Sequence, residues 1–200
     1  MRDIDQRLAE IEARFAITDI VHKFCRAADR SDLEAIPPLF HEDAVDNHAF
    51  YEGDVPGLVE WMRERHRNIL NASHNVTNIL IEFAGVDRAL VESRVTVCIR
   101  YSVAGAAAFA KAAGLVLARD RPVDVLSFGR YIDIFERRDG AWKIASRTAI
   151  PDQNLAFDVP EGAAIDSPVL VAPRRDQDDL VFQLRREMGL SFPVAKASRI

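Results

Sequence analysis

Cysteine is scarce in this sequence of 200 residues, which contains only Cys25 and Cys98. Two cysteines so far apart in the chain do not form the close pairs that hold a zinc ion or make up a redox motif. We expect both to be small buried apolar side chains. The sequence also lacks a His, Asp or Glu cluster with metal-ligand spacing, a glycine-rich phosphate loop and a serine in a nucleophile elbow. These absences predict a protein that works without a metal or another cofactor.

Long apolar runs are missing as well. No stretch approaches the ~20 apolar residues that are needed to span a bilayer. The N-terminus, Met1-Arg2-Asp3-Ile4-Asp5, is charged and lacks the apolar core of a signal peptide. We therefore predict a cytoplasmic protein with no membrane partner.

Positive charge is in slight deficit. The chain has 26 Lys and Arg residues against 31 Asp and Glu residues, which gives a net charge of −5. Broad nucleic-acid binding requires a basic face, so we predict no nucleic-acid partner. The one basic cluster, Arg63, Arg65 and Arg67, is interrupted by Glu60 and Glu64 and is typical of a solvated helix face.

The first third of the chain has helical periodicity. Apolar residues recur at helical spacing from Asp3 to Arg30, and a short helix is expected after Ser31 until two prolines interrupt it. A short strand is expected over 44–50. Asp54 can cap a third helix, with Pro56 in its first turn, that runs to about Asn68.

From Ser73 onward the pattern changes to that of strands. Four long strands are expected over 74–83, 90–103, 124–137 and 141–150, and they form two hairpins joined by short Gly/Asp turns. Helices followed by strands predict an α+β fold, a curved antiparallel sheet wrapped around the N-terminal helix and two shorter helices. Residues 104–123 are expected to form a flexible or partly helical insertion. We predict a domain over 1–158 and a C-terminal extension over 159–200, with a linker near 160–168 and a helix over 176–188, that serves as an oligomerisation arm.

Asp29 and His74 are polar residues at positions where apolar ones are expected. Asp29 ends the first helix on its inward face, where a carboxylate opposes the helix dipole. His74 opens the first long strand, on the same side of the pleat as Val76 and Leu80. A carboxylate bonded to one imidazole nitrogen fixes the tautomer and leaves the other nitrogen as a general base. The alternative is a pair of structural hydrogen bonds to the backbone.

Other residues are candidates for contact with a small-molecule ligand, and each also has a purely structural interpretation. His48 shares a strand face with Asp46 and Phe50, Asn78 is expected on the face of His74, and Arg130 could bind an anion or point outward. Three histidines lie among charged residues and are expected on the surface. The predicted substrate-binding residues are His48, Tyr101, Asn78, Arg130, Phe24 and Tyr51, and the predicted surface histidines are His22, His41 and His66.

Several spaced motifs resemble one known family. They are Ile17–Leu33, Leu39–Val45, Tyr51–Gly53, Ser73–Asn78 and Gly129–Ile144. In this order they resemble the SnoaL-like proteins of the nuclear-transport-factor-2-like superfamily, over residues 5–158. The resemblance implies a cone-shaped α+β fold.

The resemblance also has implications for chemistry. Scytalone dehydratase, bile-acid 7α-dehydratase and hexachlorocyclohexane dehydrochlorinase of this superfamily use an Asp–His pair at the places occupied here by Asp29 and His74. This implies a cofactor-free lyase or isomerase acting on a hydrophobic small molecule, with His74 as base and Asp29 as its orienting partner. The dehydratases have a tyrosine beside the helix-end Asp that this chain lacks, and Tyr101 or Tyr51 could replace it.

Two other functions fit the same fold. One is a non-catalytic module for small-molecule binding or assembly, and the other is an accessory subunit resembling the β subunit of ring-hydroxylating dioxygenases. In each case we expect a homo-oligomer, a dimer or trimer, because an open sheet usually buries its outer face.

Overall fold

The fold is built on one six-stranded sheet with the strand order β2-β1-β6-β5-β4-β3. The computed structural model describes residues 3–48, 50–114, 116, 120–160 and 171–190. Along the chain the elements are α1 (Ile4–Arg30), η1 (Leu33–Ala35), η2 (Pro37–Leu39), β1 (Phe40–Asn47), β2 (Glu52–Asp54), α2 (Val55–His66), β3 (Ile69–Phe83), β4 (Arg88–Tyr101), α3 (Val103–Ala113), β5 (Val123–Arg138), β6 (Ala141–Asp158) and α4 (Leu180–Glu187).

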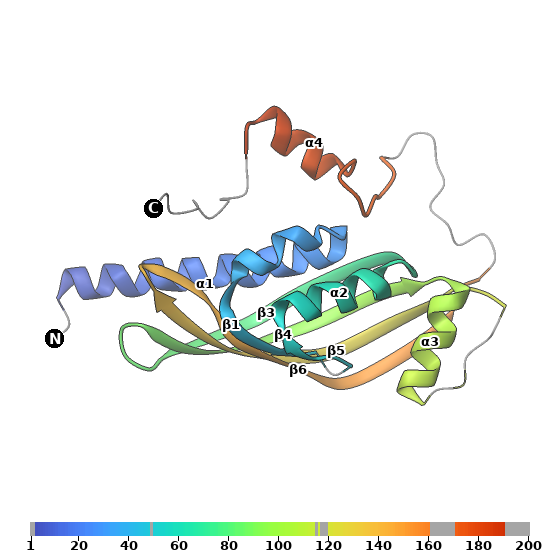
Figure 1. Cartoon of the computed structure of the whole chain (residues 1–200), viewed down its shortest axis with the longest axis horizontal. Helices are drawn as coiled ribbons and strands as arrows, with labels where there is room; N and C mark the ends of the chain where they lie inside the picture. Colours follow the sequence, from blue (N-terminus) through green and yellow to red (C-terminus); the bar gives the residue numbers. More distant parts are fainter. Residues whose placement is uncertain (1–2, 49, 115, 117–119, 161–170, 191–200) are drawn as a thin grey trace.

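The sheet curves, and α1 and α2 lie against one of its faces (Figure 1). Strands β3 to β6 form the predicted antiparallel series, each paired with the next in the chain. Strand β1 pairs in parallel with β6, an arrangement that the sequence did not predict. The α+β fold, with a curved sheet around a long N-terminal helix, is confirmed.

Helix α1 begins and ends where the sequence predicts. The Asp3 carboxylate accepts a hydrogen bond from the Gln6 amide and caps its first turn, and Ser31 ends it with a left-handed φ of 55°. The C-terminal half of the helix is buried against the sheet and carries the residues nearest the candidate site. Its buried residues are Ala13, Ile17, Ile20, Val21, Phe24, Cys25, Ala27 and Ala28.

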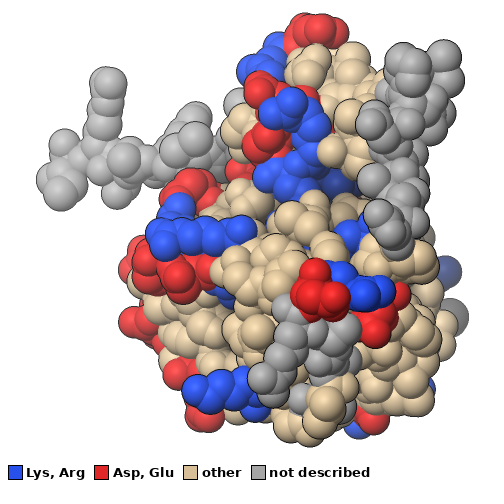
Figure 2. All heavy atoms as spheres, turned by 90° about the vertical axis from the view of Figure 1, so that its right-hand side faces the viewer, with Lys and Arg blue, Asp and Glu red and all other residues tan. Residues whose placement is uncertain are grey.

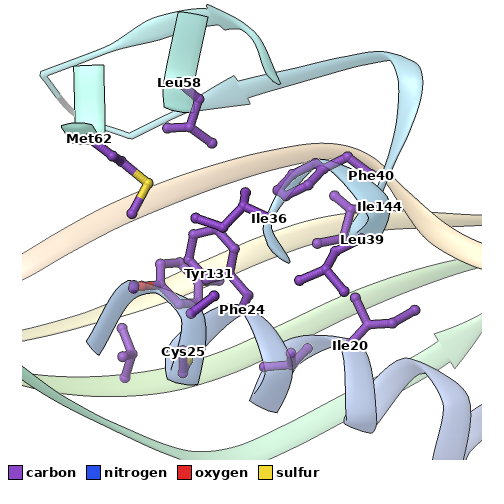
Figure 3. Packing of buried hydrophobic residues seen from close by; sticks show 14 of the residues in the cluster. Ile20, Phe24, Cys25, Ile36, Leu39, Phe40, Leu58, Met62, Tyr131 and Ile144 are labelled. Atoms are coloured by element: carbon purple, nitrogen blue, oxygen red, sulfur yellow. The ribbon is translucent and has the colours of Figure 1, made fainter. Parts of the chain in front are cut away.

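The core contains aromatic rings from several elements and one buried ion pair. Phe24 of α1 contacts Phe40 of β1 and Tyr131 of β5, with ring centroids 6.1 and 6.0 Å apart (Figure 3). Arg147 of β6 places its guanidinium 4.2 Å from the ring of Phe24. The guanidinium also donates two hydrogen bonds to Asp133, of 2.8 and 2.7 Å, and both side chains are fully buried. The charged pair thus fixes how β5, β6 and α1 pack together.

Strand β3 contains a bulge that changes which side chains face inward. The register shifts between Thr77 and Leu80, and Asn78 has a left-handed φ of 50°. Ile79 and Ile81 therefore pack inward, whereas Asn78 and Leu80 are exposed. The prediction that Asn78 and Leu80 share the face of His74 is wrong, because it assumed an unbroken alternation.

Two more helices follow later in the chain, α3 between β4 and β5 and α4 in the C-terminal extension. Helix α3 occupies the first half of the predicted insertion, whose residues 115 and 117–119 lie outside the described residues. Helix α4 begins four residues later than predicted and lies on the side of α1 and α2 that faces away from the sheet (Figure 1). The expected linker over 160–168 lies almost wholly outside the described residues, and the role of the extension as an oligomerisation arm stays a prediction.

Two further findings concern the absences noted above. Cys25 is buried as predicted, but Cys98 is exposed, because it lies on the outer face of β4. In the described parts of the chain, no helix is both long and apolar enough to cross a membrane.

Candidate active site

A mostly apolar cavity of about 140 Å³ lies between the sheet and the helices. We call it the inner cavity. Its walls come mainly from the inward faces of β4, β5 and β6, and its polar groups include two imidazoles. It is lined by His48, Phe50, Arg65, His74, Val95, Val97, Ile99, Phe109, Ser127, Phe128, Gly129, Arg130, Tyr131, Ala149, Ile150, Pro151 and Asn154.

The predicted Asp29–His74 pair forms at one side of this cavity. Asp29 lies in the last turn of α1, and His74 lies on β3, against which α1 packs. The Asp29 Oδ1 and His74 Nδ1 atoms are 2.6 Å apart, and Asp29 Oδ2 accepts a 3.0 Å hydrogen bond from the His74 backbone amide. Both side chains are largely buried, with 15% and 11% of their surfaces exposed.

This geometry determines the tautomer of His74. An ionised carboxylate can only accept hydrogen bonds, so the proton of the neutral imidazole is on Nδ1. The Nε2 lone pair is then free, and Nε2 has no hydrogen-bond partner among the described residues. Because both carboxylate oxygens of Asp29 are engaged, the pair holds His74 in one orientation at the cavity wall.

A second Asp–His pair reaches the same cavity. His48 follows the end of β1, and its Nδ1 lies 3.2 Å from Oδ1 of the fully buried Asp46. The His48 ring packs among Phe24, Tyr131 and Trp61, with centroids 5.8–6.0 Å away. The inner cavity is therefore lined by two imidazoles, each bonded through Nδ1 to a carboxylate.

An outer cavity of about 310 Å³ adjoins the inner one and shares Phe50, Arg65 and Phe109 with it. Arg65 donates a hydrogen bond to the Tyr101 hydroxyl and lies over the Trp61 ring. Arg65 is thus a partly buried cavity residue, which corrects the prediction that it belongs to a solvated helix face.

Figure 2 views the end of the molecule that carries α3, where acidic and basic residues are interspersed among uncharged ones.

A third histidine, His66, lies near the pair. It is partly buried, which contradicts its predicted place on the surface. Burial, followed by the nearby charges of Arg175 and Arg65, lowers the pKa of His66 from 6.5 to about 3. Its Nδ1 accepts a 3.3 Å hydrogen bond from Arg175, so its own proton is on Nε2. His66 is therefore a neutral imidazole next to His74.

Arg175, from the C-terminal extension, fastens this region. Its guanidinium donates hydrogen bonds to the backbone carbonyls of Ala28, Asp29 and Ile69, at 3.1, 2.8 and 2.8 Å. Two of these carbonyls lie at the C-terminus of α1, where a cation is favourable, and the third is at the start of β3. The extension thus supports the backbone that carries Asp29 and lies close to His74.

The other residues predicted to bind substrate are spread over several parts of the structure. Phe24 and Tyr101 are buried, Phe24 against the His48 ring and Tyr101 in the outer cavity. The Tyr51 hydroxyl donates to the Asp54 carbonyl at 2.6 Å, at the start of α2. Arg130 pairs with Asp152 and Glu92, so its guanidinium is already engaged. Asn78 is exposed in the bulge of β3.

The other two histidines are not part of the cavity. His22 is exposed, as predicted. His41 is buried and bonds through Nε2 to the Glu136 carbonyl at 3.0 Å, which contradicts its predicted place on the surface. Among the described residues, no group of three or more His, Cys, Asp and Glu side chains could hold a metal ion.

The sequence contained one usable signal for the residues that were missed. The buried face of α2 includes Leu58 and Met62, and the same period places Arg65 and His66 on that face three and four residues after Met62. Arg175 has no such signal, because its partners are backbone carbonyls more than 100 residues away.

The curved sheet with a long helix across it is the cone-shaped α+β fold that the sequence resemblance implied. The model of the SnoaL-like domain matches residues 9–148, and the chain belongs to this family. No curated protein matches the sequence at a significant level.

Solved structures share the fold. A hexachlorocyclohexane dehydrochlorinase, LinA type 2, is similar with a TM-score of 0.65 and 16% identity, over 82% of this chain and 99% of that one. LinA type 3 from Novosphingobium barchaimii has a TM-score of 0.64 and 16% identity, over 81% and 99%. A candidate scytalone dehydratase from Novosphingobium aromaticivorans has a TM-score of 0.60 and 23% identity, over 81% and 99%.

Proposed function

We propose that the protein is a cofactor-independent lyase or isomerase that removes a proton from a hydrophobic small molecule, with His74 as the base. The observation that carries this proposal is the 2.6 Å contact between Asp29 and the Nδ1 atom of His74, at the wall of a mostly apolar cavity. A fixed imidazole with a free Nε2 in such a setting is suited to general-base catalysis. The family and its dehydratase and dehydrochlorinase neighbours agree with this class of reaction.

Asp29 has two roles in this mechanism. It holds His74 in the tautomer that leaves Nε2 unprotonated, and its charge stabilises the imidazolium that forms when the proton is taken. The bond from Asp29 to the His74 backbone amide keeps the carboxylate aligned with the ring. A substrate carbonyl next to the acidic carbon would stabilise the resulting anion. Elimination and double-bond isomerisation both begin with this step.

Solvent-deuterium exchange tests the proposal. An aromatic ketone such as tetralone is incubated with the protein in deuterium oxide, and loss of the proton next to its carbonyl is followed by NMR. We expect the unchanged protein to speed this exchange and His74→Gln to lower the rate by about 100-fold or more. Asp29→Asn should also lower it, because an amide can donate to Nδ1 and favour the wrong tautomer.

His41→Gln is the matched control, since His41 bonds to a carbonyl away from the cavity, and it should exchange at the unchanged rate. Exchange by His74→Gln at the rate of the unchanged protein would contradict the proposal. Binding of the ketone without exchange would instead favour a non-catalytic binding module.

A further inference from the structure

His48 is a polar group of the inner cavity that takes no part in proton abstraction by His74. Its Nδ1 is bonded to Asp46, and its Nε2 has no hydrogen-bond partner among the described residues. The side chain is 16% exposed and lies in the cavity wall together with His74. We propose that His48, held by Asp46, is the general acid of the site and protonates the group that leaves the substrate. This inference rests on the proposed function and extends it to the second half of an elimination.

The surroundings of Asp46 support this role. The carboxylate is completely buried, and its Oδ2 has no hydrogen-bond partner within the described structure. A buried carboxylate is costly unless a positive charge compensates it. The fully buried Arg147, whose cationic form Asp46 helps to stabilise, is already paired with Asp133. Two buried carboxylates thus share one arginine, and the group that Asp46 has within hydrogen-bond reach is Nδ1 of His48.

The aromatic environment of His48 also fits a charged ring. Phe24, Tyr131 and Trp61 surround it at centroid distances of 5.8–6.0 Å. Aromatic faces attract cations within about 6 Å. These rings hold the imidazole in place and at the same time tolerate its charge.

The two pairs together complete the reaction. His74 Nε2 takes the proton from the carbon next to a carbonyl, and the electrons of the C–H bond form the new double bond. The C–O bond on the neighbouring carbon breaks, and the departing oxygen takes a proton from His48 Nε2, so that water leaves. His74 is then protonated and His48 is neutral, and exchange of protons with solvent restores both. No oxidant, metal or other reactant is consumed.

The contribution of an acid depends on the leaving group, and this dependence gives a specific test. Hydroxide is a poor leaving group that needs protonation, whereas acetate departs as a stable anion. The probes are the β-hydroxy ketone that dehydrates to benzylideneacetone and the β-acetoxy ketone that yields the same enone, which is followed by its ultraviolet absorption. The variants are His48→Gln, Asp46→Asn, His74→Gln and the control His41→Gln.

We expect His48→Gln to lower kcat for the β-hydroxy ketone by about 100-fold and to change kcat for the β-acetoxy ketone by less than about three-fold. Asp46→Asn should show the same selectivity with a smaller loss, because Asp46 acts through His48 as a positioning residue. His74→Gln should slow both probes equally, and His41→Gln should slow neither.

Equal losses on both probes in His48→Gln, or no loss on either, would overturn the role of His48 and leave that of His74 standing. If the unchanged protein converts neither ketone but still catalyses deuterium exchange, the elimination and its acid are both wrong, and the base remains. If it does neither, the proposed function itself fails.

Discussion

At the scale of single residues, the surroundings of the Asp29–His74 pair keep the neighbouring His66 neutral. Burial is the largest cause of the lowered pKa of His66, and the charges of Arg175 and Arg65 add to it. A histidine whose pKa falls on folding stabilises the protein fully only above its unfolded pKa, because at lower pH the unfolded chain binds a proton that the folded chain does not. His66 should therefore make the fold sensitive to mild acid.

The prediction concerns the free energy of unfolding between pH 7 and pH 5. With the pKa of His66 lowered from 6.5 to about 3, this histidine should cost about 1–2 kcal/mol of stability over that interval. His66→Gln should remove this part of the loss, as measured by urea unfolding at the two pH values. His22→Gln, at an exposed histidine, should leave the pH dependence unchanged. A loss of the same size in His66→Gln and the unchanged protein would show that His66 is not the sensitive group.

The sequence predicted the two principal residues of the site but not their support. Asp29 stood out because a carboxylate at a helix C-terminus is unfavourable, and His74 because it interrupted the pattern of a strand. Arg65 and His66 were misread, because neighbouring charges suggested a solvated face although their spacing continues the buried side of α2. Such a conflict between composition and period is resolved only by what packs against the helix.

At the scale of elements, the C-terminal extension acts as a clamp on the end of α1. Arg175 bonds three backbone carbonyls, and Gln177 bonds Asp32 just beyond the helix at 3.1 Å. Phe182 of α4 is buried, with 4% of its surface exposed. Arg30 at the end of α1 also pairs with Asp179, the N-cap residue of α4, at 3.7 Å. Because an isolated helix as short as α4 is unstable, its place over α1 depends on such contacts.

Arg175→Ala should release the extension, because hydrogen bonds from a charged group contribute about 1.5–3 kcal/mol each. Chymotrypsin should then cleave at Phe182 at least about ten-fold faster. Arg174→Ala is the matched control, since within the described part of the chain the Arg174 side chain pairs with the exposed Asp176 and Asp178 of its own segment, and its cleavage rate should not change. Equal rates in the two variants would mean that the extension is held by other contacts.

Strand and helix positions were predicted well where the local period was clear. The bulge of β3 was not predicted, because the left-handed backbone at Asn78 depends on the pairing of β3 with β4. Likewise, the parallel pairing of β1 with β6 joins segments about 100 residues apart. A local pattern identifies a strand but does not show which distant strand it joins.

At the scale of the whole molecule, the described residues leave apolar side chains exposed on both a helix and the sheet. Ile4, Leu8, Ile11 and Phe15 form a stripe on the N-terminal half of α1, and Leu155 and Phe157 lie together on β6. Exposed apolar patches of this kind commonly mark protein contacts. They are where we expect a second copy to pack, and the homo-oligomer stays a prediction.

The central claim is that Asp29 holds His74 with its proton on Nδ1 and its Nε2 atom free. The whole molecule can report on this at once, because the chain has only five histidines, whose ring nitrogens are distinguished by nitrogen-15 NMR. We predict that neutral His74 carries its proton on Nδ1, that neutral His66 carries its proton on Nε2, and that Asp29→Asn alters only the first of these assignments. A neutral His74 with its proton on Nε2 would contradict the account.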